Sequence, residues 1–354
     1  MQVEPKFMAN KPVTNEVSVK QVVSDILDTV EREREREIVA RRFGLFDRKE
    51  TLEQIGELLG ITRERVRQLE KVIVTRLKAN AANLPHIEEG QNIFIAALET
   101  TGKAARISDL TAKVAADDSR LEQSRVAFIA ELCPKLVVIN ENDFYYNAVG
   151  ILEAHDEKAM KDQVTRIIAA IKTIGKPTTI EKIAIEGKIK SPAQAAALAS
   201  ISKELATLNG QWGLIKWPMV NPRNIRDKIY VILKENGTHM HFNEIASAIK
   251  DSSFKRKDVT TQAIHNELIK DKRFVLIGRG IYALKEWGYK KGTVSDIIAQ
   301  VLREAGEPLH RDEIVKRVLQ SRFVKETTIL LNLQGKPQFK RVAKATYTLA
   351  ETTA

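Results

Sequence analysis

The stretch TLEQIGELLGITRERVRQLEKVIVTRLK, residues 51–78, has the pattern of two helices joined by a tight turn. Thr51 stands three residues before Gln54, which is the spacing of a capping box and predicts a helix start. Gly60 is suited to end that helix and form the turn, and Thr62 to cap the next helix. Apolar residues recur at helical spacing and predict one inward face for each helix: Leu52, Ile55, Leu58 and Leu59, then Val66, Leu69, Ile73 and Leu77.

The second predicted helix carries polar side chains that can read base pairs. Arg63 and Arg67 lie one turn apart on it, as do Glu64 and Gln68. In the major groove of DNA, arginine bonds to guanine, glutamine bonds to adenine, and glutamate accepts from cytosine. The pattern therefore predicts a DNA-reading helix-turn-helix, in which Gly56 allows the two helices to approach closely. The alternative is an ordinary helical hairpin with a solvated charged face.

The preceding residues favour the DNA-reading interpretation. The segment REREIVARRFGL leads into TLEQIG and TRERVRQLE, and together they resemble region 4 of primary bacterial sigma factors over roughly residues 17 to 80. This resemblance implies a domain that reads the promoter −35 element and docks on RNA polymerase. It places the base-reading positions at Arg63, Glu64, Arg67 and Gln68, and the DNA-backbone contacts near Thr51 and Arg65.

The composition of the 354-residue chain suits a polyanionic partner. Lys and Arg number 57 and Asp and Glu number 46, which gives a formal net charge of +11. Basic chains of this kind most often bind nucleic acid, although many basic proteins bind nothing acidic. The one cysteine, Cys133, is expected at a packed structural position. Because the sequence has no signal-peptide core and no membrane-length apolar run, we expect a cytoplasmic, nucleoid-associated protein without a membrane partner.

The N-terminal part of the chain divides into a lead, a domain and a linker. Residues 1–16 are polar and aperiodic and are expected to be disordered, and residues 17–82 form the sigma-region-4-like domain. Within that domain, residues 17–30 predict an amphipathic helix, and the alternating charges of EREREREIVARR predict a helix with ion pairs at i,i+3 spacing. Residues 80–91 break the pattern and predict a linker.

The rest of the chain repeats with a period of roughly 60 to 70 residues. GTHMHFNEIASAI and GEPLHRDEIVKRV align without gaps, and each stands between two predicted helices and is followed by a β-rich tail. A unit of three helices and a hairpin at this length predicts a winged helix-turn-helix. The fold expected is mainly α with small β-hairpin wings, a helix-turn-helix domain followed by four winged-helix-like units: 92–150, 160–222, 223–288 and 289–354.

The third and fourth units resemble the HARE-HTH family, a winged-helix module that also occurs in the delta subunit of Gram-positive RNA polymerase. Both share G-x-x-x-H-x-x-E-I, and the third adds R-F-x-x-x-G-R-G-x-Y-x-L, in which Gly278 and Gly280 predict the turn of a hairpin. The first two units lack the histidine and have Ser108 and Thr178 in the corresponding cap region.

Catalytic and metal sites are not expected. His241 and His310 each stand three residues before a glutamate at a helix start, which is a capping arrangement, and no neighbouring cluster completes a metal-ligand set. The sequence contains no phosphate-binding P-loop and no H-E-x-x-H zinc helix. We therefore expect a protein that is not an enzyme and needs no cofactor. It also has no aromatic-rich helix of the kind with which sigma factors open the −10 element, so we do not interpret it as a sigma factor.

The function expected is that of a sequence-specific DNA-binding transcription regulator. It would bind double-stranded DNA at a −35-like element and act at promoters with core RNA polymerase. The alternative is an interaction factor that occupies the sigma region 4 site on the polymerase without reading DNA. A third possibility is a DNA-associated protein outside transcription, such as a restriction or nucleoid component.

Overall fold

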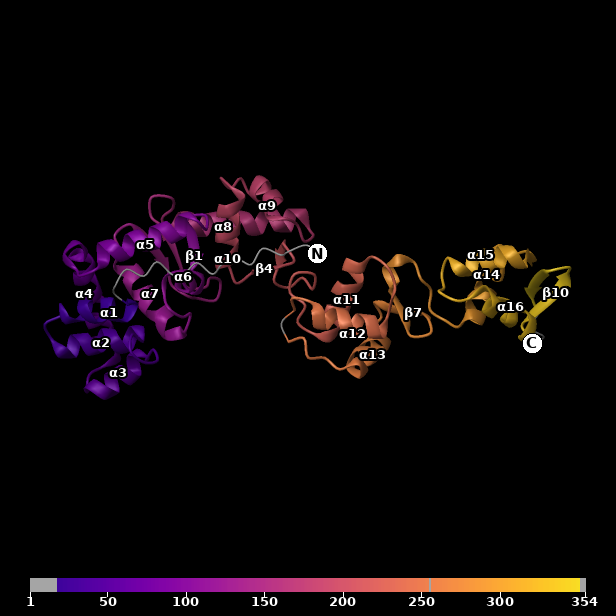
Figure 1. Ribbon diagram of the computed structural model, residues 1–354, viewed down its shortest axis with the longest axis horizontal. Coiled ribbons are helices and arrows are strands. Elements are labelled where there is room, and N and C mark those ends of the chain that lie inside the picture. The colour runs from indigo at the N-terminus through magenta and orange to yellow at the C-terminus, as the bar shows by residue number, and fades with distance from the viewer. Residues whose placement is uncertain (1–17, 255, 351–354) are drawn as a thin grey trace, which may run out of the picture. The chain divides into compact units, whose positions relative to one another are not determined.

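The computed structural model describes residues 18–254 and 256–350 (Figure 1). The chain divides into two compact units, the first ending at Ile215 and the second beginning at Lys216. The expected disordered lead, residues 1–16, lies outside the described residues. None of the helices in the described ranges is long and apolar enough to span a membrane.

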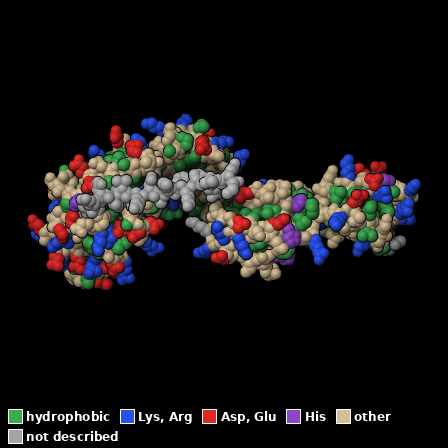
Figure 2. All heavy atoms as spheres, viewed as in Figure 1, with side chains coloured by type: hydrophobic (Ala, Val, Ile, Leu, Met, Phe, Trp, Pro, Cys, Tyr) green, Lys and Arg blue, Asp and Glu red, His purple; other side chains and the backbone are tan. Residues whose placement is uncertain are grey.

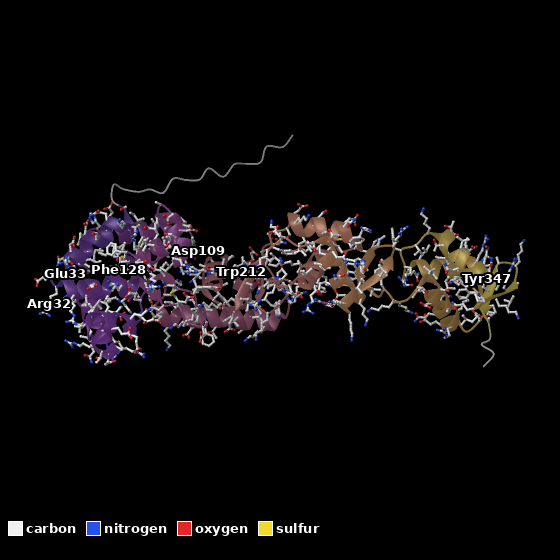
Figure 3. The ribbon with its side chains drawn as sticks, turned by 90° about the horizontal axis from the view of Figure 1, so that it is seen from below. Arg32, Glu33, Asp109, Phe128, Trp212 and Tyr347 are labelled. Carbon is white, nitrogen blue, oxygen red and sulfur yellow. The ribbon has the colours of Figure 1, made fainter. Side chains whose placement is uncertain are left out.

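The first unit begins with four helices, which are α1 Val19–Asp28, α2 Glu33–Phe43, α3 Leu52–Leu59 and α4 Arg63–Ala79. The amphipathic helix expected in residues 17–30 is confirmed as α1, whose buried residues face one way. The alternating charges form α2, and Figure 3 shows Arg32 and Glu33 at the outer edge of the unit. Arg32 Nη1 lies 3.3 Å from Glu35 Oε1, which confirms the expected ion pairing three residues apart.

The sequence-based boundaries of α3 and α4 are confirmed by their caps. The Thr51 hydroxyl accepts from the backbone N–H of Gln54, while the Gln54 side chain accepts from the backbone N–H of Thr51, so the capping box is complete. Gly60 ends α3 in the left-handed conformation, at φ +65°. The Thr62 side chain caps α4 by accepting from the backbone N–H of Arg65.

The turn between α3 and α4 packs tightly against α3. A Cβ atom on Gly56 would lie 2.7 Å from the carbonyl oxygen of Ile61, so glycine is required by the turn backbone as well as by the helix crossing. The predicted inward face of α3 was wrong at one position, because Leu58 is 55% exposed. Ile55 alone is fully buried in that stripe, and Leu52 and Leu59 pack at its edges.

A second group of elements follows without a linker. A short 3-10 helix, Ala81–Asn83, leads into α5 Ile87–Glu99, so the linker predicted for residues 80–91 is wrong. The chain continues through β1 Ala104–Arg106, α6 Ile107–Val114, α7 Arg120–Leu132, β2 Leu136–Ile139 and β3 Ala148–Ile151. The strands form an antiparallel sheet in the order β1-β3-β2.

The first unit ends with α8 Glu157–Ile174, α9 Ile180–Glu186, α10 Pro192–Ile201, β4 Leu205–Leu208 and β5 Gln211–Leu214. The strands β4 and β5 pair as an antiparallel hairpin. Two predicted caps are wrong. Ser108 lies inside α6, whose N-cap is Arg106, and Thr178 pairs with Trp212 in a β-bridge, which leaves Thr179 as the N-cap of α9.

The second unit contains two copies of the same order of elements: a helix, a short strand, two helices and a hairpin. The first copy has α11 Ile225–Asn236, β6 Met240–His241, α12 Phe242–Asp251, α13 Thr261–Lys270, β7 Phe274–Gly278, β8 Ile281–Leu284 and a 3-10 helix, Lys285–Trp287. The second has α14 Val294–Ala305, β9 Leu309–His310, α15 Arg311–Leu319, α16 Glu326–Gly335, β10 Phe339–Ala343 and β11 Thr346–Leu349. The sheets have the orders β6-β8-β7 and β10-β11-β9, and both are antiparallel.

The capping roles expected for the two histidines are confirmed. His241 Nδ1 accepts from the backbone N–H of Asn243 at 3.3 Å, and His310 Nδ1 accepts from that of Asp312 at 3.4 Å. The hairpin turn between β7 and β8 is also confirmed, with Gly280 at φ +70°. The same order of helix, strand, two helices and hairpin recurs from α5 to β3, and the structure is mainly helical with small antiparallel sheets. The assignment of these groups as winged helices stays a prediction.

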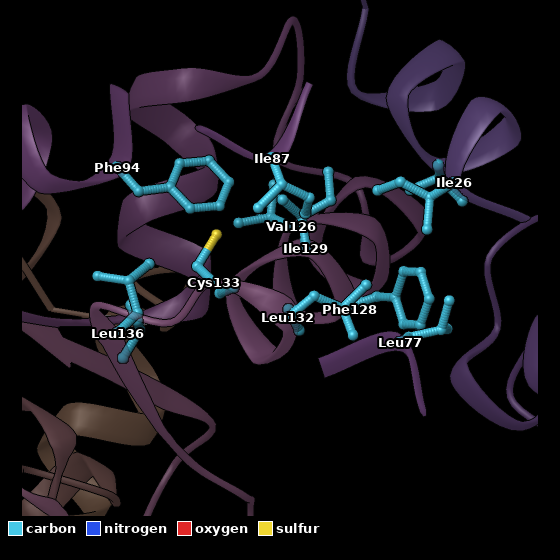
Figure 4. Packing of buried hydrophobic residues seen from close by; sticks show 14 of the residues in the cluster. Ile26, Leu77, Ile87, Phe94, Val126, Phe128, Ile129, Leu132, Cys133 and Leu136 are labelled. Atoms are coloured by element: carbon cyan, nitrogen blue, oxygen red, sulfur yellow. The ribbon is translucent and has the colours of Figure 1, made fainter. Parts of the chain in front are cut away.

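One hydrophobic core joins α1, α2 and α4 to α7. Phe128 of α7 is fully buried, and its ring meets that of Phe43 edge-on at a centroid distance of 5.0 Å. Figure 4 shows Phe128 with Leu77 of α4 and Ile26 of α1. The contact between α2, α3 and α4 has only a small core of its own, built on Ile38, Ile55 and Val66.

The shared core crosses the boundary expected between residues 82 and 92. Polar contacts cross it as well: the Arg125 Nε donates to the carbonyl oxygen of Leu45 at 2.8 Å, and Lys78 pairs with Glu131. His86 Nε2 lies 3.1 Å from Asp25 Oδ2. The helices α1, α2 and α4 are therefore packed firmly against the next group, and α3 is attached through α2 and α4. The domain boundaries in their detail stay predictions.

Candidate nucleic-acid interface

The polar residues predicted to read DNA lie together on the first two turns of α4. Arg63, Glu64, Arg65, Arg67 and Gln68 are all exposed. They are exposed because Val66, Ile73 and Leu77 hold the opposite side of the helix in the core. Figure 2 shows basic and acidic side chains intermixed over α2 and α3 beside it. These residues lie at the N-terminal end of α4, where the helix dipole is positive and favours an anionic partner.

Glu64 and Arg67 form a two-bond ion pair. Arg67 Nε donates to Glu64 Oε2 at 2.9 Å, and Arg67 Nη2 donates to Glu64 Oε1 at 2.6 Å. The hydrogen bond from Arg67 lowers the pKa of Glu64, and the same bond raises the pKa of Arg67. Both side chains are therefore charged at neutral pH. Because the pair is exposed to solvent, it contributes little to the stability of the fold.

Two more of the predicted residues join this pair. Gln68 Nε2 donates to Glu64 Oε1 at 3.4 Å, and Arg65 Nη1 donates to Gln68 Oε1 at 3.4 Å. Arg63, at the start of the helix, lowers the pKa of Glu64 further through its charge, after the larger effect of Arg67. The structure thus brings Glu64, Arg65, Arg67 and Gln68 into one hydrogen-bonded set, with Arg63 beside it.

Thr51 lies apart from this set, at the start of α3. Its hydroxyl oxygen accepts from the backbone N–H of Gln54 at 3.2 Å, and its side chain is exposed. Thr51 therefore has a structural role as a helix cap. Its contact with the DNA backbone, and the DNA contacts of the other five residues, stay predictions.

Sequence reasoning missed several basic residues beyond the second turn of α4. Lys71 and Lys78 lie four and eleven residues after Arg67, and all three line one groove together with Lys49 from the loop before α3. Helical spacing counted onward from Arg67 would have found the two lysines. No local signal could have found Lys49, because its place beside α4 depends on how the loop at residues 44–50 folds.

The described residues include potential metal ligands and one cysteine, whose arrangement bears on the candidate site. No group of three or more His, Cys, Asp or Glu among them could hold a metal ion. Cys133 is 3% exposed, and burial raises the pKa of its thiol to about 12, so it stays protonated and unreactive at neutral pH.

Comparison with known proteins agrees with the geometry of α2 to α4. Residues 32–79 match the family described as sigma-70, region 4. A 61-residue segment is 44% identical to the RNA polymerase sigma factor SigA of a Bacillus species, which is 17% of this chain and 16% of that protein. The chain thus matches about a sixth of the length of that relative. No solved structure matches the chain. The matched region points to DNA binding and to a transcription role related to RNA polymerase.

Proposed function

We propose that this protein is a sequence-specific DNA-binding transcription regulator that acts at promoters with RNA polymerase. The first two turns of α4 enter the major groove of a −35-like element, where Arg63, Glu64, Arg67 and Gln68 contact base edges. Thr51 and Arg65 contact the flanking phosphates. The protein acts by binding, without covalent chemistry or a cofactor, in the cytoplasm at the nucleoid.

The observation that carries this proposal is the exposed set of side chains at the N-terminal end of α4. Glu64 holds Arg67 by two bonds, 2.9 and 2.6 Å long, in an extended fork on the helix surface. A guanidinium held in this way is already ordered when it meets guanine, so less side-chain entropy is lost on binding. Glu64 can then accept from a cytosine amino group or continue to orient Arg67.

The remaining units supply additional contacts. We propose that the four groups beginning at α5, α8, α11 and α14 are winged-helix modules, the last two of the HARE-HTH type. The supporting observation is their shared order of three helices and a hairpin.

The alternative is a factor that docks at the sigma region 4 site on RNA polymerase without reading DNA. One observation weighs against it. The apolar sides of α1, α2 and α4 that meet in the shared core are already covered by α7 of the same chain. A partner helix that needs these apolar sides would have to displace α7, whereas a DNA duplex needs only the polar face that remains exposed.

The experiment that tests the proposal uses the full chain with Arg67→Ala. The best-bound duplex is selected from a random library, and binding to it and to its point variants is titrated. Loss of one bidentate bond pair to guanine should weaken the complex roughly 5- to 150-fold and relax the preference at one base pair. Arg303→Ala, which removes an exposed arginine from α14, is the matched control and should leave the preference at that base pair unchanged.

Two outcomes separate the candidate functions. Unchanged affinity and base preference in Arg67→Ala would remove DNA reading from α4. If the full chain then also competes tightly with a sigma region 4 for core polymerase, the docking factor becomes the function. Glu64→Gln adds a second measurement, because it breaks the ion pair while leaving Arg67 in place, and it should alter base preference more than overall affinity.

A further inference from the structure

Two grooves meet beside α4. The first, about 660 Å³, runs along α4 from Arg67 to Lys78 and is bounded on its other side by residues of the α7–β3 region, among them Asn140 and Asn147. The second, about 920 Å³, lies between the loop at residues 46–49 and the start of α7. Lys49, Glu141 and Asn147 line both, so the two form one continuous depression, called here the joined groove.

The joined groove is basic. Of the residues that line it, eight are Lys or Arg and four are Asp or Glu. Three of the four acids are already engaged, because Glu70 pairs with Arg42, Glu131 with Lys78 and Glu141 with Lys203. By contrast, Arg48, Lys71 and Arg120 form no ion pair with any described residue. The depression therefore has cationic side chains in excess of the carboxylates that could neutralise them.

The cations follow a line that starts at the predicted base-reading residues. Arg67, Lys71 and Lys78 lie along one side of α4 over eleven residues, a length of about 16 Å at the helical rise. Lys49 continues this line into the second part of the groove, where Arg48 and Arg120 follow. Partial burial, and then the charge of Arg42, lower the pKa of Lys49, and the charge of Glu141 partly offsets them.

The two walls of the joined groove are fixed to each other. Phe128 of α7 is buried among residues of α1, α2 and α4, and Arg125 binds the carbonyl oxygen of Leu45 just before the loop that carries Arg48 and Lys49. Arg120, the cation that α7 contributes to the joined groove, is therefore carried on a helix held at a set position relative to the first turns of α4. Such preorganisation is what recognition of a stiff polyanion requires.

We infer that the joined groove binds the sugar–phosphate backbone of duplex DNA next to the base pairs that α4 reads. The first group after the helix-turn-helix, residues 92–150, is then part of the DNA interface through Arg120 and its neighbours. This inference rests on the proposed function, since it takes α4 as the element that orients the duplex. An isolated basic surface would suit any polyanion, but this one is continuous with a helix whose exposed residues match base edges, which favours double-stranded DNA.

The test is the full-length variant Arg48→Gln together with Arg120→Gln. Both side chains are exposed and lie outside the predicted base-reading set. Removing one cation from a phosphate should make the slope of log affinity against log salt less steep by about 0.9. The double variant should therefore lose about 1.8 in slope, which makes the complex roughly thirtyfold weaker near 0.15 M salt. Base preference should not change, because bonds to phosphate carry no sequence information.

The matched control is Lys113→Gln, which removes one exposed cation from α6 in the same group but outside both grooves. It should leave affinity and slope unchanged. Thermal unfolding of all variants verifies that each remains folded. If the double variant does not fold, the single replacements of Arg48 or Arg120 provide the second measurement.

The outcomes separate this inference from the proposed function. If Arg67→Ala changes base preference while the double variant binds with unchanged slope, α4 reads DNA and the joined groove does not bind it. If the double variant loses slope while Arg67→Ala leaves base preference intact, the groove binds DNA but α4 does not read it. A wild-type preference for single-stranded over duplex DNA, lost in the double variant, would assign the groove to a single strand and overturn the duplex assignment. Absence of any duplex binding by the wild-type chain would overturn both.

Discussion

Replacing Phe128 by alanine should destabilise α4 of the helix-turn-helix as well as α7, the helix that carries the mutation. Phe128 is fully buried on α7, yet it packs in the same core as Val23 of α1 and Leu77 of α4. If that core stabilises α1 and α4, a cavity on α7 must weaken the helix that carries the predicted base-reading residues.

The expected loss of stability follows from the packing around Phe128. Truncation of a fully buried phenylalanine costs about 3–5 kcal/mol, because the transfer free energy is lost and a cavity remains. The edge-on packing against Phe43, at 5.0 Å and 62°, contributes to the upper part of that range. For a unit of this size the loss corresponds to a melting temperature lower by about 6–20 °C.

Hydrogen exchange of the full chain is the suitable assay, because it reports the opening of each helix separately. In Phe128→Ala, the backbone amides of α1 and α4 should exchange faster together with those of α7. The control is Phe274→Ala on β7 in the second unit, an equally conservative truncation of a residue that is 2% exposed. It should accelerate exchange around β7 and leave α4 unchanged. Faster exchange confined to α7, with α4 protected as in the wild type, would refute the idea of a shared core.

Two further predictions concern single side chains. Burial raises the pKa of Cys133 from 9.0 to about 12, so its contribution to stability is complete below about pH 9 and is lost as pH rises toward 12. Relative to Cys133→Ala, the wild type should lose about 2 kcal/mol between pH 8 and pH 10.5 in denaturant titrations, and parallel pH curves for both would contradict the buried thiol. His310→Ser should be nearly neutral, since serine is an equally good cap, whereas His310→Ala should cost about 0.5–2 kcal/mol in the same titrations. Loss of bound metal from either His310 variant would replace the capping interpretation with a metal site.

The sequence determined the local features of the helix-turn-helix. The capping box at Thr51, the left-handed end at Gly60 and the cap at Thr62 depend on residues within three or four positions of each other, so the sequence shows them directly. The exposure of Arg63, Glu64, Arg67 and Gln68 followed from the same periodicity. The repeat of helices and hairpins was likewise predictable, because each copy contains its own turn and strand signals.

Local sequence signals were less reliable where contact with another element decides which of two adjacent residues caps a helix, or which apolar residues are buried. The cap of α9 moved from Thr178 to Thr179 because Thr178 is held in a β-bridge with Trp212, more than thirty positions away. Leu58 carries the right periodicity for an inward face, but α2 and α4 reach only the side of α3 that presents Ile55. The spacing of apolar residues defines a stripe, and the packing decides how much of its width is buried.

The tertiary structure alone decided how α1, α4 and α7 come together. Nothing within a few residues of Phe128 indicates that its ring meets Phe43, or that Arg125 will donate to the carbonyl oxygen of Leu45 eighty positions earlier. The same long-range packing turns the predicted linker at residues 80–91 into the start of α5 and places Lys49 beside α4. Helix caps and periodicity are set by hydrogen bonds and geometry within one or two turns of chain, whereas a shared core forms between apolar faces that meet only when the whole unit has folded.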